Sequence, residues 1–259
     1  VVPSFIVILI IFNKNFKNWV FFIAPLLAFF YVVRPSLLFI GLYCLLIVAI
    51  KEDYKKAFIG LILFLVPILY FKDSTRSKPW HTMLCGIGAY PNIHTNLNGP
   101  VDNIGRNYFL KKTGIKIDTT PGTGNFYNPE IKKQYFDLLK QRYFEILKTN
   151  PLFILKNAIL NFFQAYGFGY RVGNLPLSYL SSLIGFGVFI IFILTRQFWL
   201  TAAIALASIS YTPYFPPIQA YMFGNFILIT IGFIFAIDTI IANYPRLKKS
   251  ILGRISLKY

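Results

Sequence analysis

The sequence is poor in charged residues and especially in acids. Its 259 residues include 9 Asp and Glu, and only 14% are charged, against about 25% in an average soluble domain. In their place, 56% of the chain is hydrophobic and 19% is aromatic, and the mean hydropathy is +0.58. This composition excludes an ordinary water-soluble domain and favours an integral membrane protein.

Cysteine and histidine are also scarce, with two of each. Cys44 lies in an apolar run and Cys85 in a polar window, so no disulfide is expected. His81, Cys85 and His94 lack a fourth ligand nearby, which excludes a zinc site of the usual kind. A nucleophilic pair of Cys85 with either histidine is chemically conceivable, but a small apolar cysteine packed in a loop is the favoured explanation. No nucleotide-binding motif is complete, and we expect neither metal nor cofactor.

Basic residues outnumber acids, with 26 Lys and Arg and a formal charge of +17. Five of them lie after the last apolar run: Arg246, Lys248, Lys249, Arg254 and Lys258. The aromatic residues of the apolar runs are not interleaved with these basic residues. Such a flank is typical of a cytoplasmic tail that contacts anionic lipid. Membrane lipid is therefore the expected partner, and nucleic acid is not.

Apolar runs predict about six membrane spans around one polar window. The predicted spans are 19–33, 37–50, 57–71, 177–195, 198–212 and 220–242. A re-entrant pair is the alternative for 19–33 and 37–50, which are separated only by Arg34-Pro35-Ser36. Residues 1–12 are too short for a span, and the missing initiator Met suggests an incomplete N-terminus. We expect four parts: N-terminal transmembrane helices in 1–71, a loop in 72–175, C-terminal transmembrane helices in 176–242 and a basic tail in 243–259.

The expected fold is an all-α membrane protein, a polytopic helical bundle with a mixed extracytoplasmic loop domain. In the window, Asn128 and Pro129 predict a helix start, and Asn150-Pro151 predicts its end. In 152–170, four polar residues share one helical face: Lys156, Asn157, Asn161 and Gln164. We expect this helix to lie in the interface or against the spans, and a true crossing is the alternative. With a cytoplasmic C-terminus, the loop 72–175 lies outside.

Candidate binding residues concentrate in the first third of the window. Trp80 and His81 follow a predicted span, at the depth where lipid-linked substrates present phosphate. The simpler alternative is a belt tryptophan beside a hydrogen-bonding histidine. Asp102 and Arg106 are four residues apart and suit a local ion pair or substrate positioning. No second carboxylate pairs with Asp102, and no catalytic residue is assigned.

The block 79–92, Pro-Trp-His-Thr-Met-Leu-Cys-Gly-Ile-Gly-Ala-Tyr-Pro-Asn, resembles an external loop of bacterial membrane proteins related to GT-C class glycosyltransferases. These enzymes use polyprenyl-phosphate-linked sugars. The resemblance adds Tyr90 and Asn92 to the candidate substrate-binding residues and implies a bacterial plasma-membrane location. The chain departs from the pattern at Ala220-Tyr221, where an Arg-Tyr pair is common, and it lacks the acidic residue of the first external loop. It would then be a C-terminal portion without the general base.

Three functions remain open on the sequence. The first is the membrane-embedded C-terminal part of a glycosyltransferase-like protein that handles a lipid-linked sugar. The alternative is a non-catalytic structural or assembly subunit whose external loop, 72–175, docks a protein partner. A transporter is the weakest hypothesis, because no inverted repeat is visible and only Lys156 and Asp238 are charged within apolar runs.

Overall fold

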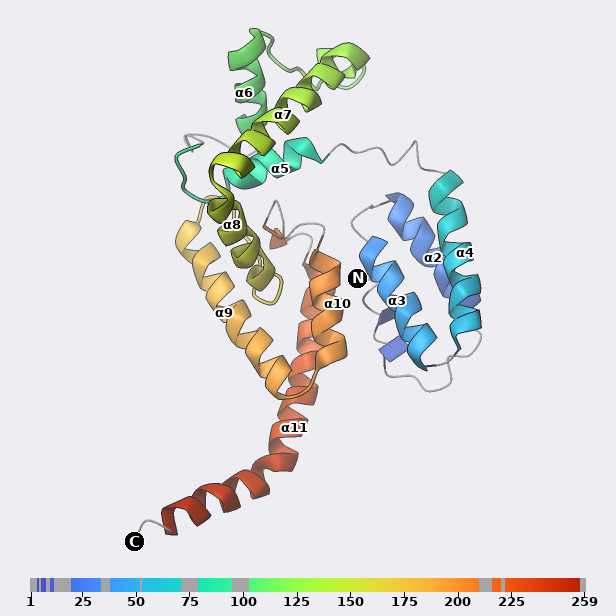
Figure 1. The fold of residues 1–259 in the computed structure, drawn as a ribbon, viewed down its shortest axis with the longest axis vertical. Helices are drawn as coiled ribbons and strands as arrows, with labels where there is room; N and C mark the ends of the chain where they lie inside the picture. Colours follow the sequence, from blue (N-terminus) through green and yellow to red (C-terminus); the bar gives the residue numbers. More distant parts are fainter. Residues whose placement is uncertain are drawn as a thin grey trace.

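The structure is a computed structural model, and it describes residues 4, 6–7, 10–11, 20–33, 38–51, 53–70, 79–94, 103–209, 216–219 and 222–256. Over these ranges the regular structure is helical and contains no strand, apart from one isolated parallel bridge between Tyr170 and Ile218. The predicted all-α class is confirmed for this part of the chain. Three groups of helices can be followed in Figure 1: α2–α4, α5–α7 and α8–α11.

The first group contains α2 (Val20–Val33), α3 (Leu38–Lys51) and α4 (Tyr54–Tyr70). They coincide with the first three predicted apolar runs, except that α4 begins inside the expected polar loop. Asp53 explains the early start, because its side chain accepts a hydrogen bond from the Lys55 amide (2.8 Å) and its carbonyl accepts one from Ala57. The cap at Asp53 therefore lets α4 begin at Tyr54, three residues before the apolar run predicted from 57.

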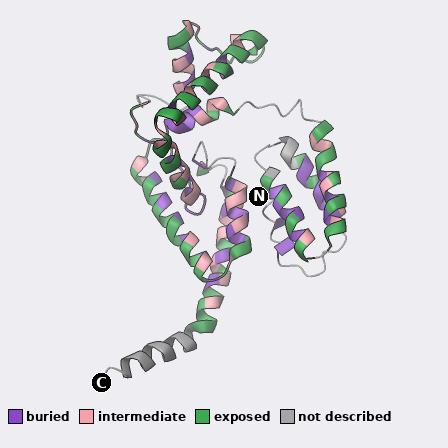
Figure 2. Ribbon diagram, in the orientation of Figure 1, coloured by how far each residue is buried: buried purple, intermediate pink, exposed green. Residues whose placement is uncertain are grey.

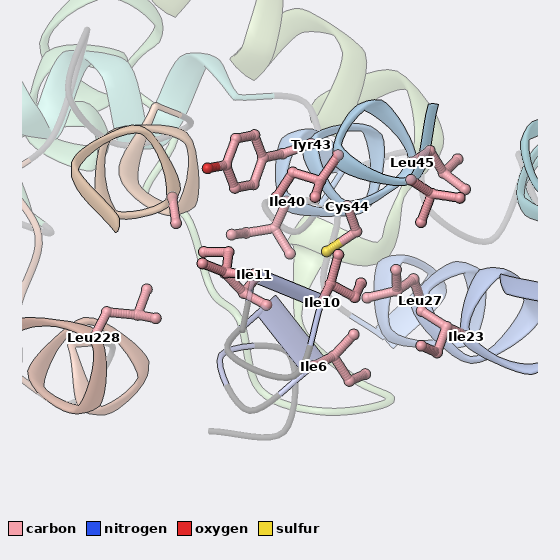
Figure 3. Close-up of a cluster of buried hydrophobic side chains, with 14 of the residues drawn as sticks. Ile6, Ile10, Ile11, Ile23, Leu27, Ile40, Tyr43, Cys44, Leu45 and Leu228 are labelled. Carbon is pink, nitrogen blue, oxygen red and sulfur yellow. The ribbon is translucent and has the colours of Figure 1, made fainter. Parts of the chain in front are cut away.

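These helices share one hydrophobic core with the last group. Figure 3 shows Ile40, Tyr43 and Cys44 of α3 facing the same buried cluster as Leu228 of α11. The Tyr43 hydroxyl donates to the carbonyl of Trp199 in α10 (Phe198–Ser208). Apolar packing and this hydrogen bond join the N-terminal helices to the C-terminal ones.

The polar window forms a small helical unit with a core of its own. It contains α5 (Trp80–Ile87), α6 (Asn103–Thr113), the short 3-10 helix η2 (Asn125–Tyr127) and α7 (Pro129–Thr149). We call α5, α6, η2 and α7 the head. Its buried residues come from all three α-helices and the loop after α6: Leu84, Ile87, Phe109, Ile117, Tyr135, Phe136, Leu139, Tyr143 and Ile146. The sequence predicted mixed loop structure before residue 128, and α5 and α6 replace part of it.

The predicted start and end of the long amphipathic helix are confirmed. The Asn128 side chain accepts a hydrogen bond from the Glu130 amide (2.9 Å), and Pro129 occupies the first turn. Asn150 then ends α7 and caps α8 (Pro151–Gln164), where it accepts from the Phe153 amide at 3.3 Å. The same Asn-Pro signal therefore both stops one helix and starts the next.

The last group is completed by α9 (Leu175–Leu194) and α11 (Phe223–Ser256). The helix α11 continues through most of the tail predicted for 243–259. Among the residues that the structure describes, two helical stretches are long and apolar enough to cross a membrane, namely Leu175–Leu194 and Phe223–Asn243. The stretches Val20–Phe29, Phe39–Lys51 and Phe198–Ser208 are apolar but shorter. Of the six predicted spans, two therefore meet the length and composition of a crossing helix.

In α8 and α9 several polar residues are buried and several leucines are exposed, and Figure 2 shows buried and exposed residues along both helices. In α8, Asn161 and Gln164 are 0% exposed, whereas Leu152 is 75% exposed. In α9, Ser178 and Ser181 are 0% exposed, while Leu183 and Leu194 are exposed. Of the polar face predicted for 152–170, Asn157, Asn161 and Gln164 are buried and Lys156 is exposed. Gln164 contacts α9 by donating a hydrogen bond to the carbonyl of Ser178 (3.1 Å).

Candidate functional site

His81, Tyr135 and Cys85 meet where α5 crosses α7. His81 Nδ1 lies 2.7 Å from the Tyr135 hydroxyl oxygen, and His81 Nε2 lies 3.6 Å from Cys85 Sγ. Two tautomers fit these distances: either Tyr135 donates to Nδ1 and Nε2–H faces the sulfur, or Nδ1–H donates to Tyr135 and the thiol donates to Nε2. In both, each ring nitrogen of His81 contacts a protein side chain, so the imidazole ties two helices together.

The helix α6 closes over this hydrogen bond at Gly105. A Cβ atom on Gly105 would lie 3.0 Å from the Tyr135 hydroxyl oxygen and 3.1 Å from His81 Nδ1. Arg106, the next residue, is half-buried near Tyr135. Burial raises the pKa of Tyr135 above its ordinary value, and the Arg106 charge opposes this only in part. Tyr135 therefore keeps its proton, and Arg106 is the nearby cation. Asp102 lies outside the described residues.

Trp80 faces the outer side of α7 and not the His81 pair. Lys140 Nζ lies 5.5 Å from the centre of the indole ring, and the Phe144 ring centre lies 5.6 Å from it. Both distances are within the range of cation–π and aromatic contacts. An open groove follows α7 beside these residues, and its described lining comes from one face of that helix: Asp137, Lys140, Gln141, Phe144, Glu145 and Lys148. Aromatic, cationic and carboxylate groups are thus within reach of one ligand.

Tyr90 lies where the head meets α8. It is 2% exposed; its hydroxyl accepts a hydrogen bond from Gln164 Nε2 (2.7 Å) and donates to Asn161 Oδ1 (3.4 Å). Burial raises the pKa of Tyr90, with smaller opposing effects from hydrogen bonds to Ser182 and Gln164. The hydroxyl of Tyr170 donates to the carbonyl of Ala89 (3.3 Å). These contacts hold the end of the block 79–92 on the bundle.

Asn92 builds the turn after Tyr90. Its amide nitrogen donates to the carbonyls of Ile87 (2.7 Å) and Tyr90 (2.8 Å), and its Oδ1 accepts from the His94 amide (2.8 Å). The candidate residues therefore separate into three places. Trp80 lies beside the groove, against Lys140 and Phe144, His81 and Arg106 lie near Tyr135, and Tyr90 and Asn92 lie at the junction with α8. They share one segment of chain but do not converge on one point.

Sequence reasoning missed two residues that the structure brings to these places, namely Tyr135 and Lys140. Helical spacing alone places Tyr135 on the apolar face of α7 and Lys140 on its charged face. A hydroxyl on an otherwise apolar face was the available signal for Tyr135, because a buried hydroxyl needs a partner. For Lys140 there was none, since its partner Trp80 is 60 positions earlier in the chain.

Within the described ranges, no three His, Cys, Asp or Glu side chains are grouped so as to hold a metal ion. Comparison with protein-family models, with curated proteins and with solved structures gives no match. The site is thus defined by the geometry of this chain alone.

Proposed function

We propose that the chain is an integral membrane protein whose head binds the sugar-phosphate end of a lipid-linked sugar. The contact between Trp80 and Lys140 carries the proposal. A sugar ring stacks on an aromatic face, and an ammonium group pairs with phosphate. Lys140 Nζ is 5.5 Å from the indole centre, so both groups can contact one sugar phosphate.

Reversed burial in the bundle supports the membrane part of the proposal. Lipid tails are as apolar as leucine, so helices in a bilayer direct small and polar residues at each other and apolar residues outward. The outward Leu183 and Leu194 and the inward Ser178 and Ser181 of α9 follow this rule. Aromatic Trp80, which begins the head, would then lie at headgroup depth, where tryptophan is enriched.

The groove beside Lys140 supports the sugar part. Asp137, Gln141 and Glu145 carry oxygens that accept hydrogen bonds from sugar hydroxyls, and Lys148 adds a second cation. The resemblance of 79–92 to an external loop of GT-C class enzymes also supports a binding site outside the spans. In this proposal the chain binds and positions the lipid-linked sugar, polyprenyl phosphate being the carrier, and the general base comes from elsewhere. The bacterial plasma membrane, with residues 72–175 outside and the C-terminus inside, is part of the same proposal.

Binding to the purified chain in lipid nanodiscs tests this function. The probes are farnesyl phosphoryl glucose and, as a sugar-free comparison, farnesyl phosphate. We expect Lys140→Gln to weaken binding of both probes about tenfold, because one charge-assisted hydrogen bond is lost. Trp80→Ala should weaken binding of the glucose compound more than that of farnesyl phosphate.

The matched control is Lys133→Gln, which removes the same charge from an exposed position of α7 outside the groove. Its affinity for both probes should equal that of the wild type. Equal affinities for the Lys140→Gln variant and the wild type would contradict the proposed site, and equal losses in the two lysine variants would reduce it to a general charge effect.

A further inference from the structure

A line of buried polar atoms without partners follows α8. Four buried side-chain atoms have no hydrogen-bond partner in the part of the chain that the structure describes: His94 Nε2, Asn157 Oδ1, Gln164 Oε1 and Ser181 Oγ. Native proteins pair nearly all such atoms, so each one calls for an explanation. All four lie on α8 or against it, although they come from three segments of the chain.

The unpartnered atoms extend from His94, which follows the head segment α5, along α8 into the bundle. The ring of His94 packs 6.0 Å from that of Phe153, in the first turn of α8. From Phe153, the residues Asn157, Asn161 and Gln164 follow at steps of four, four and three, which places them on one helical face. Eleven residues of helix span roughly 16 Å. Asn157, Asn161 and Gln164 of α8, together with Ser178, Ser181 and Ser182 of α9, are called the polar seam below.

The chemistry of the seam selects its ligand. The amide nitrogen of Gln164 already donates to the Tyr90 hydroxyl (2.7 Å) and to the carbonyl of Ser178 (3.1 Å). What remains free on Gln164 and Asn157 is an amide oxygen, which only accepts. Phosphate and carboxylate oxygens also accept and would be repelled. A neutral hydroxyl, from water or from a sugar, donates what these oxygens need.

The seam is closed in this structure. A Cβ on Gly185 would lie 1.8 Å from the Phe163 carbonyl oxygen, and one on Gly167 would lie 2.7 Å from Ser181 Oγ. Because glycine lets α8 and α9 touch at the backbone, hydroxyl groups reach the free oxygens only when the two helices separate. We propose that the polar seam is a binding site for neutral hydroxyl groups that opens by separation of α8 from α9.

Cysteine labelling of the full chain in lipid nanodiscs tests the proposal. Ser181→Cys places a thiol in the seam at a position that is 0% exposed, and Val188→Cys places one on the same helix at a buried apolar position that is 7% exposed. The wild type, whose Cys44 and Cys85 are both buried, serves as the blank. The reagent is 2-aminoethyl methanethiosulfonate, followed by mass spectrometry. We expect Ser181→Cys to react about tenfold faster than Val188→Cys, because local opening exposes only the seam.

Two further measurements identify the hydroxyl source and the role of the seam. Methyl α-glucoside should slow the labelling of Ser181→Cys if sugar hydroxyls occupy the seam, and leave it unchanged if water does. Adding Asn157→Leu, which replaces a side chain whose amide oxygen has no partner by an apolar group of similar size, should slow the labelling in either case. Labelling of Ser181→Cys at the rate of Val188→Cys would overturn the proposal. That result leaves binding in the head untouched, so the two proposals fail separately.

Discussion

The head and the α8–α9 pair obey opposite burial rules within one chain. In the head, Leu139 is 0% exposed, and charged residues such as Lys133 cover the surface. In α8 and α9, Gln164 and Ser181 are 0% exposed, and Leu183 is 67% exposed. The hydrophobic effect explains the first arrangement in water. The second arrangement is the one expected for helices in apolar surroundings, which is what the proposed membrane location would provide.

The contrast also shows how each region achieves close contact. The head packs large side chains in a core, where Tyr135 touches the rings of Phe109, Phe126 and Phe136 edge-on. The α8–α9 pair instead brings backbones together at glycine, as small residues do in membrane helices. The stability of the head therefore depends on how its large side chains fill the core. The stability of the α8–α9 contact depends on glycine, which has no side chain to keep the two backbones apart.

The largest expected effect comes from Gly185→Ala. The added Cβ would lie 1.8 Å from the carbonyl oxygen of Phe163, a backbone atom that cannot rotate away. We expect the free energy of unfolding to fall by about 3 kcal/mol, measured by denaturation in mixed micelles. Gly187→Ala is the control, since its Cβ meets nothing within 4 Å and should gain roughly 0.5 kcal/mol from helix propensity. Equal stability of the two variants would contradict backbone contact at Gly185.

Next in size is Leu183→Lys, on the exposed side of α9. In a bilayer, the substitution should cost about 2.5 kcal/mol, because it transfers a charge into hydrocarbon. The same change at Leu110, which is 40% exposed in the head, should stay within about 0.5 kcal/mol. Unfolding of both variants in mixed micelles measures the difference. A Leu183→Lys variant as stable as Leu110→Lys would remove the distinction between the two surfaces.

Removal of a helix cap should have a moderate effect in the head. Asn128→Ala deletes the side chain that accepts from the Glu130 amide, at a cost of about 1 kcal/mol. Thermal unfolding followed by circular dichroism measures it. Asn107→Ala serves as control, because Asn107 is exposed within α6 and caps nothing. Were Asn107→Ala to lose as much stability as Asn128→Ala, the cap would have no special role.

The smallest effect concerns alkaline pH and Tyr135. Burial raises its pKa in the folded state, so the unfolded chain, with a tyrosine pKa of about 10, releases this proton first as the pH rises. The stabilising contribution is present below pH 10 and declines above it. The free energy of unfolding of the wild type and of Tyr135→Phe should be compared at pH 7 and at pH 10.5. Between these two pH values, the difference should shift by about 0.8 kcal/mol in favour of Tyr135→Phe. A difference that is constant with pH would show that Tyr135 does not titrate differently on folding.

The sequence predicted those features that local chemistry decides. Asn128, Pro129 and Asn150 locate α7, because caps and prolines act within a turn of the chain. Apolar runs located α2, α3, α9 and α10 to within a few residues. The helices α5 and α6 were missed, because Leu84 and Phe109 become buried only against α7, far along the chain. For the same reason the sequence named Trp80 and His81 but not their partners Lys140 and Tyr135.

Spin-label accessibility tests the reversed burial most directly. A nitroxide at Leu183→Cys in lipid vesicles should collide with oxygen, which dissolves in lipid, and not with a water-soluble nickel chelate. A nitroxide at Lys133→Cys, on the exposed face of α7, should show the opposite preference. Collision of the nickel chelate with the label at position 183 as readily as at position 133 would contradict the membrane environment of α9.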